Sequence, residues 1–242
     1  MTKRRRKILM RRLIYIPIVH SSADMGSMSE SLEQVYMKEY GRRKWARRTR
    51  IVEKIWKEVE RKISLLPLDY AKVKIYQDGL PKCGRELEIA KSAAAGGSKN
   101  YQLVLDLVEK GAQLIGTEDP NLLIQEYHQL RNTLDNLQGS PASHPPSADA
   151  SLRDSRERNR KAELPKNKWK ITSPINRRSA GFGAETSPDA VEGFVSQRDK
   201  YIALRIDETL RDGETGFLFV GVIHRVNEML PLDIQIYYLL PT

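Results

Sequence analysis

The chain has 242 residues and a formal net charge of +10, with Lys and Arg concentrated at 3–12, 42–50 and 153–178. This length suits one ordinary domain with a substantial core. The single cysteine, Cys83, excludes an internal disulfide, and no run approaches the roughly 18 apolar residues that span a bilayer. These properties predict a cytoplasmic protein without a membrane span.

The N-terminal part consists of a basic tail, residues 1–12, and a continuous apolar run at Leu13–Val19 that leads to His20. An apolar run without alternation predicts a strand that is covered on both faces. Pro17 lies inside this run and lacks a backbone N–H, which favours an edge position or a local bulge.

Two helices are predicted after this strand. The first begins with Ser27 and Glu30, which have the spacing of a capping box, and is interrupted at Gly41. The second runs from Arg43 to about Leu65. It carries an apolar stripe with i, i+4 spacing, formed by Ile51, Ile55, Val59 and Ile63.

A short strand is predicted at Val73–Tyr76, and the loop after it carries Asp78. Helices are predicted at 86–95 and 100–111, and from Glu118 to about Leu137. The segment 112–116 fits either a short strand or a turn between helices.

Composition changes abruptly at Gln138. From there to residue 192 the chain is rich in Ser, Pro, Arg, Asn and Lys and has almost no aliphatic residues. Such a segment buries too little apolar surface to offset its ordering entropy. It is interpreted as a low-complexity, disordered insert, either a true insertion or a degenerate segment, between domain parts 13–137 and 193–242.

The C-terminal part predicts a helix from Arg198, with Ile202, Ile206 and Leu210 on one face, ended by Asp212-Gly213. Phe217–Ile223 follows as a fully buried strand that ends at His224. The last strand, Ile234–Tyr238, alternates and is expected to be half covered.

Together these elements predict an α/β fold with a central mixed or mostly parallel sheet and helices on both faces. In open α/β sheets, ligands bind outside the carboxyl ends of the strands. Two predicted strands end in histidine, His20 and His224, and the chain has only four histidines. If these strands are neighbours, the two imidazoles can reach one ligand.

The carboxylates nearest this edge are Asp24, Glu30 and Asp78. His20 and His224 are candidate catalytic residues together with Asp78, and candidate metal ligands together with Glu30. Two histidines and a carboxylate suit a divalent metal ion, which lowers the pKa of a bound water. The same set without metal suits general acid–base chemistry.

Arg198 and Asp199 open the predicted C-terminal helix. Arg198 is a candidate ligand-orienting residue that would hold an anionic group. Asp199 in a first turn would complement the helix dipole.

The blocks Ile16–His20, Arg198–Ala203 and Gly221-Val-Ile-His224 together resemble the TraB/Tiki/ChaN and erythromycin-esterase-like superfamily. They cover about a fifth of the chain, and Pro17 stands where that pattern has its first glycine. The resemblance implies an α/β fold with a histidine site at the sheet edge. It also implies a range of activities from metal-dependent peptidase and esterase-like hydrolysis to haem and pheromone handling.

Three functional hypotheses follow. The first is a hydrolase, metal-dependent or not, acting on a small-molecule or peptide substrate. The second is a non-catalytic protein that binds a small ligand such as haem, or a protein partner. The third is non-specific electrostatic binding of nucleic acid or another polyanion by the basic clusters.

Overall fold

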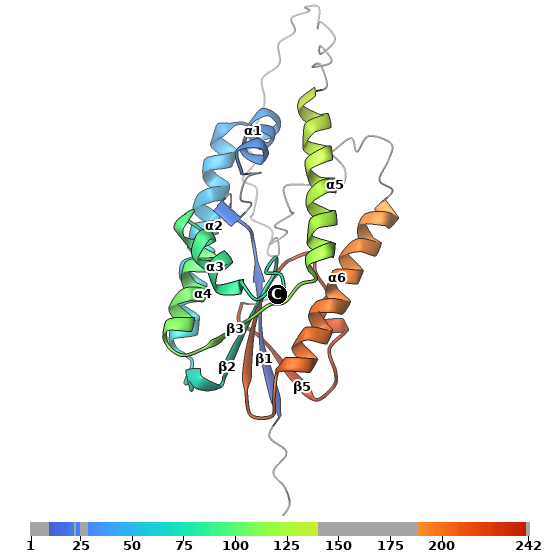
Figure 1. Ribbon diagram of the computed structural model, residues 1–242. Helices are drawn as coiled ribbons and strands as arrows, with labels where there is room; N and C mark the ends of the chain where they lie inside the picture. The colour runs from blue at the N-terminus through green and yellow to red at the C-terminus, as the bar shows by residue number, and fades with distance from the viewer. Residues whose placement is uncertain (1–9, 22, 25–28, 140–187, 241–242) are drawn as a thin grey trace, which may run out of the picture.

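The structure is a computed structural model that describes residues 10–21, 23–24, 29–139 and 188–240, with the course of the backbone alone at 133–139 and 188–192. Its five strands form one parallel sheet in the order β3-β2-β4-β1-β5 (Figure 1). The strands are β1 Arg11–Ile18, β2 Val73–Gln77, β3 Gln113–Ile115, β4 Thr215–Gly221 and β5 Ile234–Tyr238. The predicted α/β fold is confirmed, and of the mixed or mostly parallel sheets that were expected, the observed sheet is parallel throughout.

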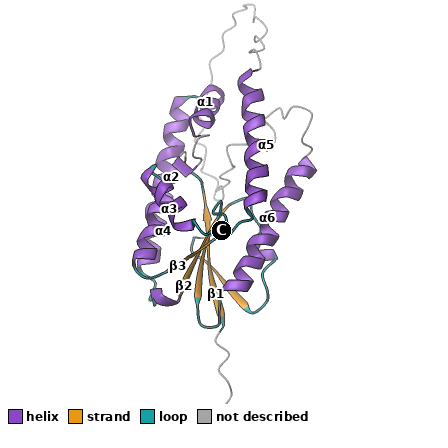
Figure 2. Cartoon of the chain, in the orientation of Figure 1, coloured by secondary structure: helices purple, strands orange, loops and turns teal. Residues whose placement is uncertain are grey.

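Helices connect the strands and cover both faces of the sheet (Figure 2). They are α1 Ser29–Tyr40, α2 Arg42–Ser64, α3 Glu86–Ala95, α4 Lys99–Glu109, α5 Pro120–Gly139 and α6 Pro188–Thr209, with short 3₁₀ turns η2 at Tyr70–Lys72 and η3 at Val226–Glu228. Within the described residues, no helix is long and apolar enough to cross a membrane.

Each face of the sheet has its own apolar core. On one face, side chains of β1, β2 and β4 pack against α2 and α4, and Trp56 stacks near Phe219 with ring centroids 6.4 Å apart. On the other face, α6 contributes the predicted stripe Ile202, Ile206 and Leu210. This two-sided covering explains why β4 is buried along its whole length.

The β1 strand begins at Arg11, two residues before the predicted start. Arg11 is buried because its guanidinium bridges Asp207 of α6 at 2.8 Å and Asp233 before β5 at 2.7 Å. The end of the predicted basic tail therefore belongs to the sheet.

Pro17 lies in β1, which is not an edge strand. It is tolerated because β5 pairs with β1 only at Arg11–Tyr15, so that Pro17 lies beyond this ladder and opposite only Val220 of β4. The predicted edge position therefore applies only to the C-terminal end of β1, where β5 no longer pairs with it.

Two further details differ from expectation, the end of β4 and the buried face of α2. β4 ends at Gly221, and Val222 and Ile223 lie in an exposed turn, because His224 N–H donates to the Gly221 carbonyl and ends the extended backbone. The buried face of α2 is Val52, Trp56, Val59 and Ile63, with the predicted Ile51 and Ile55 at its half-buried margin.

The segment 112–116, for which strand and turn both remained open, contains the edge strand β3. The predicted insert 138–192 falls almost entirely outside the described residues, but α5 extends to Gly139 and α6 already begins at Pro188. Ser27 of the predicted capping box also lies outside them.

Candidate functional site

The candidate site lies where three neighbouring strands end. Because β4 lies between β1 and β2 and all three are parallel, their carboxyl ends meet at one edge. His20 follows β1 by two residues, Asp78 follows β2 directly, and His224 follows β4 after a short turn. The tertiary structure thus brings together the three residues that the sequence proposes as catalytic.

Asp78 is the centre of this cluster and is almost fully buried. One carboxylate oxygen, Oδ2, lies 3.5 Å from Nε2 of His20 and 3.5 Å from Nε2 of His224. The same oxygen accepts a hydrogen bond of 2.9 Å from the Gly221 N–H, and Oδ1 accepts one of 2.6 Å from Arg198. One carboxylate therefore holds two imidazoles and a guanidinium around it.

Gly221 forms the wall against which these groups pack. A Cβ at this position would lie 3.1 Å from Asp78 Oδ2, 3.4 Å from His224 Cδ2 and 3.5 Å from His20 Nε2. The absence of a side chain therefore permits the backbone N–H to approach Asp78.

The two histidines differ in their surroundings. The side chain of His224 is 2% exposed and that of His20 is 37% exposed. His224 Nδ1 lies 2.5 Å from Asp199 Oδ1, and its carbonyl accepts a hydrogen bond from the Tyr15 hydroxyl at 3.3 Å. His224 is thus fixed inside the protein, whereas the side chain of His20 is partly exposed.

Arg198 connects Asp78 to two further acids. Its guanidinium donates to Glu118 at 2.5 and 3.0 Å and to Glu126 at 2.8 Å, in addition to Asp78. The residue predicted to orient an anionic ligand is therefore occupied by carboxylates of the protein itself. Its observed partners are Asp78, Glu118 and Glu126.

Glu30, the predicted third metal ligand, lies elsewhere. It is exposed in the first turn of α1, where it accepts a hydrogen bond from Gln34 of the next turn. Asp24 is closer to the cluster: it accepts a hydrogen bond from Ser98, and its charge acts on His20.

Electrostatics couple the groups of the cluster. Burial alone would lower the pKa of His20 and of His224, but the hydrogen bonds and charges of their carboxylate neighbours outweigh it and raise both pKa values. Burial alone would raise the pKa of Asp78, but the charge of His224, the His20 hydrogen bond and Arg198 hold it well below its usual range. Asp78 is therefore an anion that favours protonated imidazoles.

Glu118 behaves differently. Complete burial is the largest influence on it, and although Arg198 opposes this, the negative charge of Asp78 adds to it and the pKa of Glu118 rises to about 7. Arg198 thus contacts two carboxylates with different pKa values: that of Asp78 is well below its usual range, and that of Glu118 is about 7.

Sequence reasoning missed the roles of Asp199, Glu118 and Glu126. Asp199 was expected in the first turn of its helix, but α6 begins at Pro188 and Asp199 lies in its interior, facing His224. Glu118 follows β3 as Asp78 follows β2, which is the one signal that points to it.

The donor types at this edge fit a divalent cation, since His20, His224 and Asp78 supply two nitrogens and an oxygen. As placed, however, no group of three His, Cys, Asp or Glu residues in the described part of the chain forms a metal site. Both oxygens of Asp78 already accept hydrogen bonds from the protein. A metal ion would therefore have to compete with Arg198 and Gly221 for this carboxylate.

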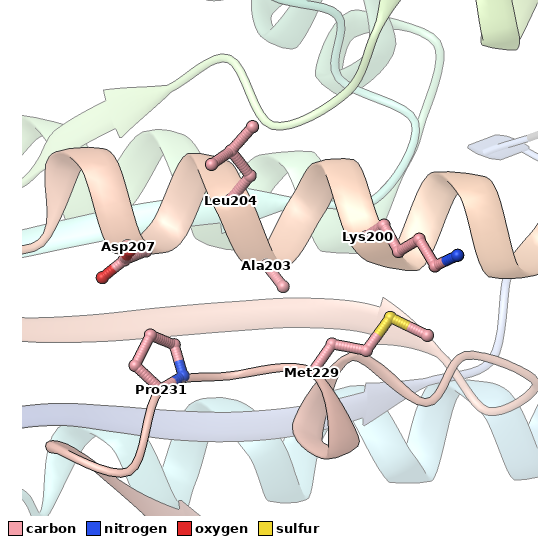
Figure 3. Close-up of a pocket in the computed structure, with 6 residues that line it drawn as sticks. All are labelled: Lys200, Ala203, Leu204, Asp207, Met229 and Pro231. Carbon is pink, nitrogen blue, oxygen red and sulfur yellow. The ribbon is translucent and has the colours of Figure 1, made fainter.

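One separate pocket lies beside α6, where Lys200 and Ala203 face Met229 and Pro231 of the segment that leads to β5 (Figure 3). None of the residues of the histidine cluster lines it.

Comparison with known proteins adds no family assignment: no family model, no curated protein and no solved structure matches this chain.

Proposed function

We propose that this chain is a hydrolase in which His20 transfers the proton of the attacking water. The observation that carries the proposal is that His20 Nε2 lies 3.5 Å from the buried carboxylate of Asp78 while its side chain remains 37% exposed. A carboxylate on one ring nitrogen orients an imidazole and leaves the other nitrogen available as the base. Among the described residues, Nδ1 of His20 has no hydrogen-bond partner, so it is the nitrogen that would meet solvent.

In this proposal, Nδ1 of His20 accepts a proton from water as the water oxygen bonds to the electrophilic carbon of the substrate. The same nitrogen then returns the proton to the leaving group, so the histidine is regenerated. Because its neighbours raise the pKa of His20, neutral imidazole becomes available at a higher pH than for an exposed histidine. Activity is therefore expected to rise with pH through that pKa.

His224 and Arg198 act through Asp78 in this scheme. Asp199 holds His224 by Nδ1, and the second imidazole nitrogen of His224 faces Asp78. Together with Arg198, this imidazole keeps Asp78 ionised in a buried position. We assign both as positioning residues.

In a second form of the same proposal, the hydrolase uses a divalent metal ion. His20, His224 and Asp78 would hold it, and the ion would supply a water of lowered pKa. For this form, the ion would have to displace the hydrogen bonds that Arg198 and Gly221 donate to Asp78.

The test is hydrolysis of a panel of p-nitrophenyl esters by the wild type and by His20→Ala, Asp78→Asn and His128→Ala. His128 is the matched control, since it is exposed on α5 and lies outside the cluster. Loss of a general base lowers kcat/KM by about 10²- to 10⁴-fold. We expect this loss for His20→Ala and Asp78→Asn, and wild-type rates for His128→Ala. Equal rates in His20→Ala and wild type would refute the proposal.

Elemental analysis of the purified protein separates the two forms. Near-stoichiometric metal in the wild type that vanishes in His20→Ala/His224→Ala would establish the metal-dependent form. Full activity of a chelator-treated, metal-free wild type would establish the acid–base form.

A further inference from the structure

A second basic side chain, Arg48, lies directly beside the candidate base. It projects from α2, and its guanidinium donates a hydrogen bond of 3.3 Å to the carbonyl oxygen of His20. This contact joins the basic helix α2 to the segment just after β1. The accepting carbonyl belongs to His20, the same residue whose imidazole is the proposed base. The guanidinium of Arg48 therefore lies next to the backbone of His20.

Arg48 is held in place by aromatic rings and not by acids. Its guanidinium carbon lies 5.7 Å from the ring centroid of Trp45 and 5.9 Å from that of Tyr36, and these two rings pack together at 5.3 Å. Cation–π contacts of this kind fix a guanidinium without neutralising its charge. Within the described residues, Arg48 forms no ion pair.

The surroundings of Arg48 disfavour its positive charge. The side chain is half-buried, and burial lowers the pKa of its guanidinium, with only Tyr36 acting in the opposite direction. A guanidinium has five N–H donors, and one hydrogen bond uses only one of them. A bound anion would supply both the missing charge and the missing acceptors.

The charge around Arg48 adds attraction over a longer range. Arg42–Arg50 contains six Lys or Arg residues and no acid, and five of the six are exposed on α2. Such a cluster raises the local concentration of anions and their rate of arrival, and salt screens this effect. Lys44 also lies over one ring, that of Tyr40, but Arg48 is the half-buried member of the six and contacts two rings as well as the carbonyl of His20.

From these contacts we infer that the substrate carries an anionic group, a carboxylate or a phosphate, and that Arg48 binds it next to the bond that His20 acts on. That the bound anion belongs to a substrate depends on the proposed hydrolase function. The anion site itself follows from the placement of Arg48. Arg198 is excluded from this role because its donors already meet three carboxylates.

The kinetic test compares two esters that differ in charge, p-nitrophenyl butyrate and p-nitrophenyl hemiglutarate, at fixed ionic strength. Loss of a hydrogen-bonded charge pair corresponds to about 10- to 100-fold in kcat/KM. We expect the ratio of kcat/KM for the hemiglutarate ester to that for the butyrate ester to fall by this factor in Arg48→Met, with Arg48→Lys in between. Arg47→Met is the matched control, since Arg47 is an exposed neighbour on the same helix.

A binding test decides the anion site independently of turnover. Wild type, Arg48→Met and Arg47→Met are titrated calorimetrically with inorganic phosphate and, separately, with glutarate. Binding that is lost in Arg48→Met and kept in Arg47→Met supports the site, and the tighter of the two ligands identifies the anionic group.

Together, the two tests show which of the two proposals fails. If neither ester is hydrolysed but an anion binds through Arg48, the hydrolase proposal fails and the anion site stands. If no anion binds, or if both arginine variants lose binding equally, the inference is overturned whatever the esterase result. A thermal melt of each variant verifies that Arg48→Met remains folded.

Discussion

Asp199 and His224 form a buried pair in which Oδ1 of the carboxylate lies 2.5 Å from Nδ1 of the imidazole. The other oxygen of Asp199 accepts a hydrogen bond of 2.8 Å from the N–H of Arg225. One carboxylate thus holds both the ring of His224 and the backbone that follows it. This directs the second ring nitrogen of His224 toward Asp78.

Asp199→Asn is expected to lower the pKa of His224, because it removes a negative charge and the hydrogen-bond acceptor that favour the imidazolium. Histidine ring signals followed by NMR through a pH titration measure this change, with His128 as an internal reference. Loss of a hydrogen bond to a charged group is also expected to cost about 1.5–3 kcal/mol of unfolding free energy. An unchanged His224 titration in Asp199→Asn would contradict the pairing.

Glu118 is expected to make stability depend on pH below neutrality. Its pKa is raised from 4.5 to about 7 in the folded protein, so the folded state binds its proton more tightly than the unfolded state does. The stability from this proton is fully present below pH 4.5 and is lost as the pH rises through about 7.

Glu118→Gln tests this linkage because glutamine does not titrate. The unfolding free energy of wild type relative to Glu118→Gln should fall as the pH rises from 4.5 through about 7, as measured by urea unfolding, and the effects of acids that do not interact with Glu118 cancel in the difference. Glu88→Gln, an exposed residue paired with Arg85, serves as control and should show no such trend. A constant difference for Glu118→Gln would show that folding leaves the pKa of Glu118 unchanged.

Gly221→Ala is expected to disturb the site more than the fold. The new methyl group would lie 3.1 Å from Asp78 Oδ2 and would push both imidazoles from their present positions. We expect a loss of esterase activity and altered histidine titrations while cooperative unfolding is retained.

Gly193→Ala provides the contrast. Gly193 lies in α6 with nothing within 4 Å of an added Cβ. Alanine in a helix interior is more favourable than glycine by about 0.5–1 kcal/mol. This variant should be slightly more stable than wild type and equally active. Activity loss in both glycine variants would argue against a local role for Gly221.

Phe219→Ala is expected to destabilise the whole domain. Phe219 lies in the central strand β4, is fully buried and packs near Trp56 of α2. Removing a buried phenylalanine side chain costs about 3–5 kcal/mol. Denaturant unfolding should show this loss, whereas Leu232→Ala should leave stability unchanged because Leu232 is fully exposed. Similar losses in both would show that β4 is not at the centre of the core.

Much of the fold could be predicted because burial leaves a local pattern. The continuous apolar runs of β1 and β4 indicate strands covered on both faces, and the stripe of Ile202, Ile206 and Leu210 indicates the helix that covers one of them. The edge position of His20, Asp78 and His224 follows from the same pattern, since each comes after a predicted strand.

The ends of strands were harder to predict where a polar contact between distant or turn residues determines them. Arg11 continues β1 because two aspartates from distant segments neutralise it, and no local pattern shows this. Val222 and Ile223 have the composition of a strand, yet a hydrogen bond between His224 and Gly221 turns the chain before them.

The amino-acid sequence was enough to predict a covered, mixed or mostly parallel sheet with histidines and a carboxylate after its strands, because these features depend on residues close together in the chain. Only the tertiary structure decided that β4 lies between β1 and β2, and hence that His20 and His224 meet at the same Asp78 oxygen. It also decided that Arg198 is held by Glu118 and Asp78 while Arg48 remains unpaired among the described residues. These pairings join residues far apart in the chain, 120 positions for Arg198 and Asp78 and 146 for His224 and Asp78, so they depend on strand order and helix register and not on any local pattern.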